Sequence, residues 1–258
     1  MKKLQETTPQ PNSEKSRNNL TDYVRAKNDS WNGRPSAGNS DGAYPHKDYY
    51  IFHNIALYVR TPLPEHIDLH YVLRTVEGML PQEIIESTGV EMILIGDFEE
   101  LAEREIQSVW KQDEGTIMVT NEQDSNEDMI DDIVHEFAHA TEDTYGFELY
   151  ADDAIEKEFL LKRRHLYDIL SAHGHEAPLQ QYLHIGYRQE FDQFLYKEVG
   201  YEKLTHFTMG LFTSPYAATS VREYFASGFE EYFLESGDRT TLGRISPALY
   251  TKISELLN

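Results

Sequence analysis

The chain has 258 residues, of which 40% are hydrophobic, enough for one catalytic domain with a sizeable core and an additional tail. Cysteine is absent, which excludes disulfides and thiolate metal ligands but fits a secreted bacterial protein as well as a cytosolic one. The formal net charge of −22 argues against binding to nucleic acid or anionic membranes, because both require clustered Lys and Arg. We expect a monomer without membrane insertion.

Residues 1–45 are rich in Asn, Gln, Ser, Pro and Gly, and we predict a disordered or loosely ordered tail. Lys2 and Lys3 imitate the start of a signal peptide, but polar residues 5–10 stand where an apolar stretch is required. No secretory signal or transmembrane span is therefore expected in this segment. The protein stays inside the cell, leaves it by another route, or has its signal outside this chain. Residues 46–258 are predicted to form the folded domain.

The next part of the chain alternates between strand and helix patterns. The sequence predicts strands at 49–59, 90–95 and 116–120, and helices at 66–79, 81–87 and 98–110. This order indicates an α/β (α+β) fold with a small mixed sheet. Residues 117–119 fit two alternatives, either a strand at the rim of a cleft that pairs with extended substrate, or an interior strand.

A helix is predicted over residues 125–145, with Ser125 and Asp128 as a capping box and Gly146 as the stop. His135 and His139 are four residues apart and project from the same face, so they can hold one metal ion. Glu136 lies about 100° further round, where its carboxylate can act as a general base. The alternative is a surface helix with two solvated histidines.

Two histidines and a water leave tetrahedral zinc one protein ligand short. The strongest candidate is Glu223, in the first turn of a helix that Thr219 or Ser220 caps and that runs to about residue 235. An ordinary first-turn glutamate that satisfies the helix dipole would have the same position.

Residues 135–143 (HEFAHATED) and 216–226 (YAATSVREYFA) together resemble the motifs of the anthrax lethal factor-like (ATLF-like) zinc metallopeptidases, which include Pro-Pro endopeptidases. The resemblance implies a zincin-like (gluzincin) fold in which His135, His139 and Glu223 hold Zn²⁺. It also implies that Glu136 and Tyr216 are catalytic, with Tyr216 assisting the transition state. A metalloendopeptidase with a protein or peptide substrate is expected, secreted by analogy with the family or else cytoplasmic.

The chain departs from this family in two respects. Ser227 stands four positions after Glu223, where the family often has an acidic residue, and the stretch between the two motifs is long. We therefore expect an insertion at 152–210 and a mainly helical lower lobe, with helices at 154–172, 179–199 and 202–211. Two alternatives to a peptidase are a non-catalytic toxin-like binding module and another zinc hydrolase, such as an amidase.

Four other features are less specific. His173 and His175 are more typical of an interhelical loop than of a metal site, and residues 162–164 (KRR) are interpreted as a solvated helix face. Glu142 and Asp143 either orient a ligand imidazole or are exposed helix-end carboxylates. Residues 112–156 contain 15 acidic residues and no Lys or Arg, which predicts either a cleft that attracts cationic peptides or a solvated acidic surface.

Overall fold

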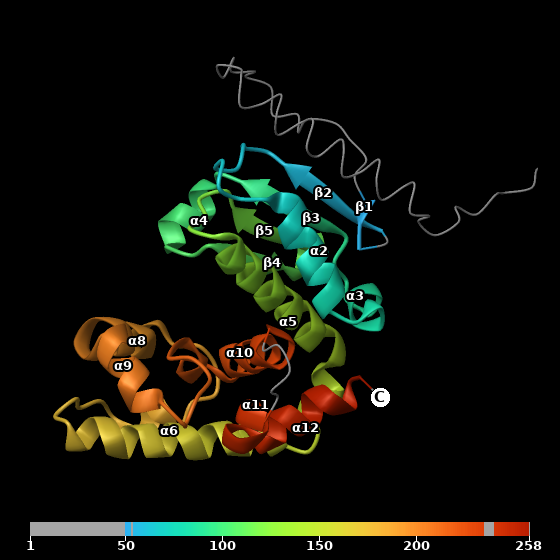
Figure 1. Ribbon diagram of the computed structural model, residues 1–258. Coiled ribbons are helices and arrows are strands. Elements are labelled where there is room, and N and C mark those ends of the chain that lie inside the picture. Colours follow the sequence, from blue (N-terminus) through green and yellow to red (C-terminus); the bar gives the residue numbers. More distant parts are fainter. Residues whose placement is uncertain (1–49, 53, 235–239, 258) are drawn as a thin grey trace, which may run out of the picture.

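The computed structural model describes residues 50–52, 54–234 and 240–257, which form a mixed α/β structure (Figure 1). The five strands all lie between residues 50 and 120, and helices from residue 154 onward form a separate layer below the sheet (Figure 1). The predicted tail at 1–45 lies outside the described residues. The predicted mixed sheet followed by a mainly helical part is confirmed at this coarse level.

The sheet contains β1 (Tyr50–Ile51), β2 (Ile55–Val59), β3 (Met92–Gly96), β4 (Ser108–Lys111) and β5 (Thr116–Thr120). Its strand order is β1-β2-β3-β5-β4. The three middle strands are parallel, while β1 and β4 pair antiparallel at the two edges. Ile93 and Ile95 of β3 face Ile117 and Val119 of β5 in this register.

The two faces of the sheet have separate cores because successive side chains of a strand point to opposite faces. Ile93 and Ile117 belong to the main core together with α2 (Leu69–Met79), α3 (Gln82–Ser87) and the long helix α5. Leu94 and Met118 point the other way and pack with Leu101 of α4 (Glu99–Arg104). The sheet is therefore buried on both faces, as its continuous apolar strands indicate.

Two predictions for this part were wrong, and one pair of alternatives is decided. Residues 49–59 form two paired strands, β1 and β2, instead of one. The helix predicted at 98–110 ends at Arg104, since Glu105 adopts the left-handed conformation at φ 54°, and residues 108–111 form β4. The strand β5 has the predicted bounds but lies between β3 and β4. Of the two alternatives for residues 117–119, the interior strand is therefore confirmed, and β4 is the edge strand.

The helix α5 (Asn126–Tyr150) begins where the sequence predicts, because the Ser125 hydroxyl accepts a hydrogen bond from the Asp128 amide at 3.1 Å. Gly146 does not end it. The helix bends at Tyr145, whose φ and ψ are −108° and 22°, and continues to Tyr150. Its apolar arc is buried as predicted and includes Ile133 and Phe137.

Below the sheet lie α6 (Ala154–Ala172), α7 (Leu179–Tyr182), α8 (Gln189–Gln193), a π-helical turn (Phe194–Val199), α9 (Tyr201–Thr208), α10 (Val221–Leu234), α11 (Thr240–Ile245) and α12 (Pro247–Glu255). The single helix predicted over 179–199 is thus three short pieces. The helix α10 packs against α5, α6 and α12, and so connects the two layers. Within the described ranges, no helix has the length and apolar composition needed to cross a bilayer.

The interpretation of residues 162–164 as a solvated face was wrong for two of the three. Arg163 is 1% exposed and donates to the carbonyl oxygens of Ala218 at 2.6 Å and Gln181 at 2.6 Å. Lys162 is also buried and donates to the Ile245 carbonyl at 2.6 Å. Both side chains therefore connect α6 by hydrogen bonds to backbone segments that are distant in sequence.

Candidate metal centre

The two histidines of the HEFAH segment lie one turn apart on α5, at the side that α10 covers. Their rings are 4.7 Å apart between centroids and nearly perpendicular. The His135 side chain is 17% exposed and the His139 side chain 9%. The alternative of two solvated surface histidines is therefore wrong.

Glu223 reaches both histidines from the first turn of α10. This turn is capped by Ser220, whose hydroxyl accepts a hydrogen bond from the Glu223 amide at 3.2 Å. The Glu223 Oε2 atom lies 3.1 Å from His135 Nε2 and 3.7 Å from His139 Nε2. One ligand atom from each of the three residues lies within 4.8 Å of the other two. Two imidazole nitrogens and one carboxylate oxygen form a donor set that suits tetrahedral zinc.

The charges of the three side chains depend on one another. Burial lowers the pKa of His135, but hydrogen bonds to Glu223 and Glu230 outweigh this effect and hold its pKa well above the ordinary value. Burial raises the pKa of Glu223, but contacts with His135 and His139 outweigh it and keep the pKa well below the usual range. Without a metal, the cluster therefore pairs positively charged imidazole with negatively charged carboxylate. A divalent cation that binds there takes the place of the imidazole protons.

Glu136 is buried, with 4% of its surface exposed. Its Oε1 atom accepts a hydrogen bond from the Ser108 hydroxyl at 2.6 Å. Ser108 begins the edge strand β4, which the sequence did not predict, so this contact was missed as well. The bond fixes the orientation of one oxygen of the Glu136 carboxylate.

Tyr216 lies in a short 3-10 turn (Tyr216–Ala218) just before α10 and is 37% exposed. Burial and the nearby carboxylates of Glu223 and Asp192 raise the pKa of its phenol. The hydroxyl is therefore protonated at neutral pH and can donate a hydrogen bond. Tyr216 is thus close enough to Glu223 for the carboxylate to affect its pKa, and its role in catalysis stays a prediction.

Glu142 and Asp143 follow His139 and are not exposed helix-end carboxylates. Asp143 accepts hydrogen bonds from Trp110 Nε1 at 2.8 Å and Arg222 Nη1 at 2.8 Å. Glu142 accepts a hydrogen bond from the Tyr150 hydroxyl at 2.5 Å, but its Oε2 atom is 3.7 Å from His139 Nδ1, too far for a direct hydrogen bond. Glu142 therefore does not orient His139 through a direct hydrogen bond.

The other ring nitrogen of His135 has a carboxylate partner that the sequence did not indicate. His135 Nδ1 makes a short hydrogen bond to Glu230, on the third turn of α10. Ser227 makes a different contact, since its hydroxyl lies 3.1 Å from the Ser214 hydroxyl. The only sequence signal for Glu230 is its seven-residue spacing from Glu223, which puts both on one helix face.

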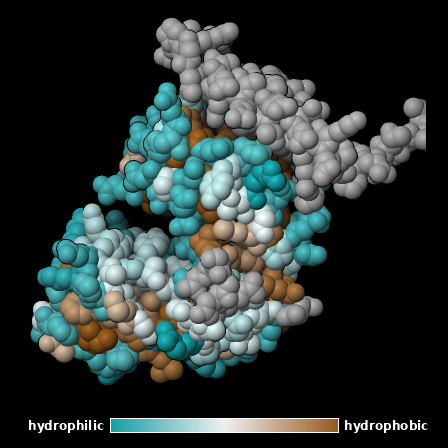
Figure 2. All heavy atoms as spheres, viewed as in Figure 1, coloured by the Kyte–Doolittle hydropathy of each residue, from teal (hydrophilic) through white to brown (hydrophobic). Residues whose placement is uncertain are grey.

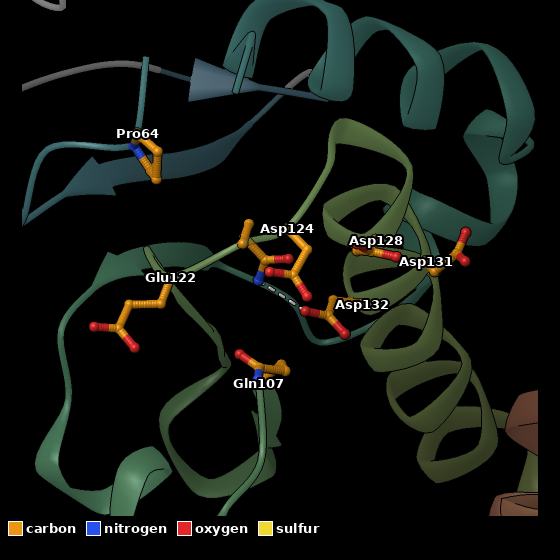
Figure 3. A pocket seen from close by; sticks show the side chains of 8 residues that line it. Pro64, Gln107, Glu122, Asp124, Asp128, Asp131 and Asp132 are labelled. Atoms are coloured by element: carbon orange, nitrogen blue, oxygen red, sulfur yellow. Dashed lines mark hydrogen bonds between the residues drawn. The ribbon is translucent and has the colours of Figure 1, made fainter. Parts of the chain in front are cut away.

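An acidic pocket of about 590 Å³ opens beside the first turns of α5 (Figure 3). It is lined by Pro64, Gln107, Glu122, Gln123, Asp124, Asp128, Asp131 and Asp132. Figure 3 shows Asp124 and Asp132 pointing toward the space that Gln107 and Glu122 border. Partial desolvation of the exposed Asp131 and stronger desolvation of the half-buried Asp132 raise the pKa of each to about 6. Part of the acidic stretch at 112–156 thus borders a cavity one turn from His135.

Two further observations concern the predicted loop histidines and the predicted insertion at 152–210. His173 Nδ1 lies 2.8 Å from the Ile169 carbonyl, and His135, His139 and Glu223 form the only group found in the described part of the chain that is close enough to hold a metal. Figure 2 shows the surface hollowed between the part that carries α4 and the part that carries α8. The 152–210 segment does not seal the centre, since Glu223 retains 13% exposure of its side chain.

Comparisons with known proteins do not identify a family for this chain. No protein-family model matches the chain. No curated protein matches it in sequence. One similar solved structure is that of a candidate zinc-binding metallopeptidase from Bacteroides caccae, with 13% identity, coverage of 94% of this chain and 84% of that chain, and a TM-score of 0.36. A likeness this weak does not establish a shared fold or function.

Proposed function

We propose that this protein is a zinc-dependent metalloendopeptidase of the ATLF-like, gluzincin type, with one catalytic domain at residues 46–258. The observation that carries the proposal is the convergence of His135, His139 and Glu223. Their ligand atoms lie within 4.8 Å of one another, although Glu223 is 84 residues beyond His139 in the chain. The donor set suits zinc and leaves room for a fourth ligand, which is typical of a catalytic site.

His135, His139 and Glu223 would hold the ion, which when bound supplies a Lewis acid for the scissile carbonyl and makes water a better nucleophile. Glu136 would take a proton from the attacking water and deliver it to the nitrogen of the leaving amine. The Ser108 hydroxyl holds one Glu136 oxygen and leaves the other for this transfer. Tyr216 would donate its hydroxyl hydrogen to the developing oxyanion.

The edge strand β4 would bind the extended substrate in place of β5. Within the described residues, β4 pairs with β5 on one side and with no strand on the other. Its free backbone groups can pair with a peptide. Ser108 of this strand contacts Glu136, so a peptide along β4 would pass the general base.

The test is a cleavage assay with a peptide library on the full chain loaded with zinc. Glu136→Ala is expected to abolish hydrolysis and to keep one zinc per chain, because Glu136 handles protons and is not a ligand. His135→Ala is the matched variant that should lose the metal. Equal zinc loss in both variants would contradict the roles. A wild type that binds one zinc but cleaves no peptide would support a binding module instead.

A further inference from the structure

The two metal-binding histidines are held very differently. His135 is bonded on both sides, through Nε2 to Glu223 at 3.1 Å and through Nδ1 to Glu230. The contacts of His139 are longer, since its buried Nδ1 atom has no hydrogen-bond partner and its Nε2 atom lies 3.7 Å from Glu223 Oε2. The His135 ring is thus oriented by hydrogen bonds on both sides, while the nearest carboxylate oxygens of Glu142 and Glu223 lie 3.7 Å from the His139 ring nitrogens.

The helix α10 supplies both partners of His135 from one face. Residues 223, 227 and 230 are spaced i, i+4 and i+7, so they lie along the same side of the helix over about 10 Å. Glu223 occupies the first of these positions and Glu230 the last, with the His135 ring bonded to both. The middle position is therefore not needed to orient this histidine.

Ser227, at the middle position, serves the turn that carries Tyr216. Its hydroxyl lies 3.1 Å from the Ser214 hydroxyl, and Ser214 in turn accepts a hydrogen bond from the Ala217 amide at 3.1 Å. Ser227 is 4% exposed, so water does not compete for this bond. The chain of contacts ends one residue from Tyr216.

We propose that Glu230 is the positioning residue of the metal centre and that Ser227 positions Tyr216. Glu230 fixes the His135 ring through Nδ1 and leaves Nε2 toward the metal position, a task that carboxylates commonly perform for ligand histidines. This division of tasks along one helix face rests on the proposed zinc function. A change of Glu230 should therefore alter zinc affinity, and a change of Ser227 should alter turnover.

The first measurement is the zinc dissociation constant of metal-free protein, obtained by competition with a chromophoric chelator. Glu230→Ala is expected to weaken zinc binding by about 10- to 100-fold. Glu230→Gln should lose less, because its amide oxygen can still accept the Nδ1 hydrogen. Glu202→Gln, at an exposed position in the first turn of α9, is the control and should stay within about twofold of wild type. Wild-type affinity in Glu230→Ala would overturn the role of Glu230.

The second measurement separates Ser227 from Glu230. Ser227→Ala should lower kcat by about tenfold or more through misplacement of Tyr216, with zinc affinity unchanged. Loss of zinc affinity in this variant to the level of Glu230→Ala would overturn the division. Circular dichroism melting of each metal-free variant checks folding, and Glu230→Gln provides the affinity test if Glu230→Ala is unfolded.

Failure of the zinc function can be told apart from failure of this inference. If His135→Ala binds zinc as well as wild type does, the metal centre itself is wrong, and the role of Glu230 is wrong with it. If His135→Ala loses zinc while Glu230→Ala retains wild-type affinity, only the role of Glu230 is overturned.

Discussion

Tyr216 is the residue on which the peptidase assignment depends most, because a metal-binding protein without catalysis does not need its hydroxyl. Tyr216→Phe removes that hydroxyl and should lower kcat by about 10²-fold or more with little change in KM, as expected for a donor used mainly in the transition state. Zinc content should not change. Steady-state kinetics on a cleaved peptide measure the effect.

Tyr71→Phe is the matched control, since Tyr71 is 47% exposed on α2. It should turn over like the wild type. If Tyr216→Phe does the same, the offset between Tyr216 and Glu223 has no catalytic meaning, and the ATLF-like assignment weakens with it.

Asp131 allows a prediction about pH and stability. Its side chain is exposed, but partial desolvation, with the charge of Glu230 next in importance, raises its pKa from 3.8 to about 6. A raised pKa means that the folded state is relatively favoured while the group is protonated, and this advantage is lost as pH rises from about 4 to about 6. Above that range the ionised carboxylate destabilises the fold. Asp131→Asn should therefore have a higher melting temperature than wild type at pH 7.5.

The difference between Asp131→Asn and wild type should shrink as pH falls through 6 and vanish near 4, where both side chains are neutral. Asp128→Asn is the control, because Asp128 lies in the first turn of α5 and its charge favours the helix dipole. It should be slightly less stable than wild type at pH 7.5. An Asp131→Asn advantage that does not depend on pH would contradict the electrostatic explanation.

At the scale of elements, α6 connects the 152–210 segment to the turn that carries Tyr216. Arg163 donates to the carbonyls of Ala218 and Thr219, which follow Tyr216, and its guanidinium lies 4.0 Å from the centre of the Phe191 ring. Burial lowers its pKa to about 9, so it is still charged at neutral pH. Carbonyl oxygens and aromatic rings surround this charge, and its removal leaves buried carbonyls without donors.

Arg163→Met should therefore lower the free energy of unfolding by roughly 2 to 4 kcal/mol. Arg164→Met is the matched control on the same helix. The Arg164 side chain is 51% exposed, and its ion pair with Asp168 is long, at 3.7 Å, and exposed to solvent. It should change stability by less than about 0.5 kcal/mol. Urea denaturation of the metal-free proteins decides the matter, and equal stability of the two variants would show that Arg163 is not needed for the turn.

A second connection joins the edge strand β4 to α5 and α10. Asp143 of α5 accepts hydrogen bonds from Trp110 of β4 and from Arg222, the residue before Glu223 on α10. Burial raises the pKa of Asp143, but the bonds from Arg222 and Trp110 outweigh this and lower it. The spacing between His139 and Glu223 is therefore set by a charged bond between the two helices as well as by apolar packing.

The sequence predicted those features that depend on residues close together in the chain. The apolar arc of α5, its Ser125 cap and the strand at 116–120 follow from residue spacing alone. The strand β4 was missed because it has four residues, and Glu105 gives no signal for the left-handed turn that ends α4. Buried Arg163 and the bond from His135 to Glu230 were missed because their partners lie 55 and 95 residues away.

At the scale of the whole molecule, the chain is strongly negative, and one acidic pocket lies close to the proposed peptide path. The net charge is −22, and the acidic pocket adjoins α5 one turn before His135. Gln107 of this pocket precedes Ser108 of the edge strand, so the pocket and the expected peptide path are neighbours in sequence. Above pH 7, Asp131 and Asp132 are both ionised, given pKa values of about 6.

A field of this sign attracts cationic peptides and raises their association rate by 10-fold or more at low ionic strength, an effect that fades as the Debye length falls to about 8 Å at physiological salt. A peptide with Lys beside the cleaved bond should thus have a kcat/KM about tenfold above its Glu counterpart at pH 7.5 and low salt. The advantage should decline with added NaCl. Asp124→Asn with Asp128→Asn should reduce it. Equal kcat/KM for the two peptides at low salt would mean that these carboxylates form a solvated surface with no part in substrate selection, while the zinc mechanism would be unaffected.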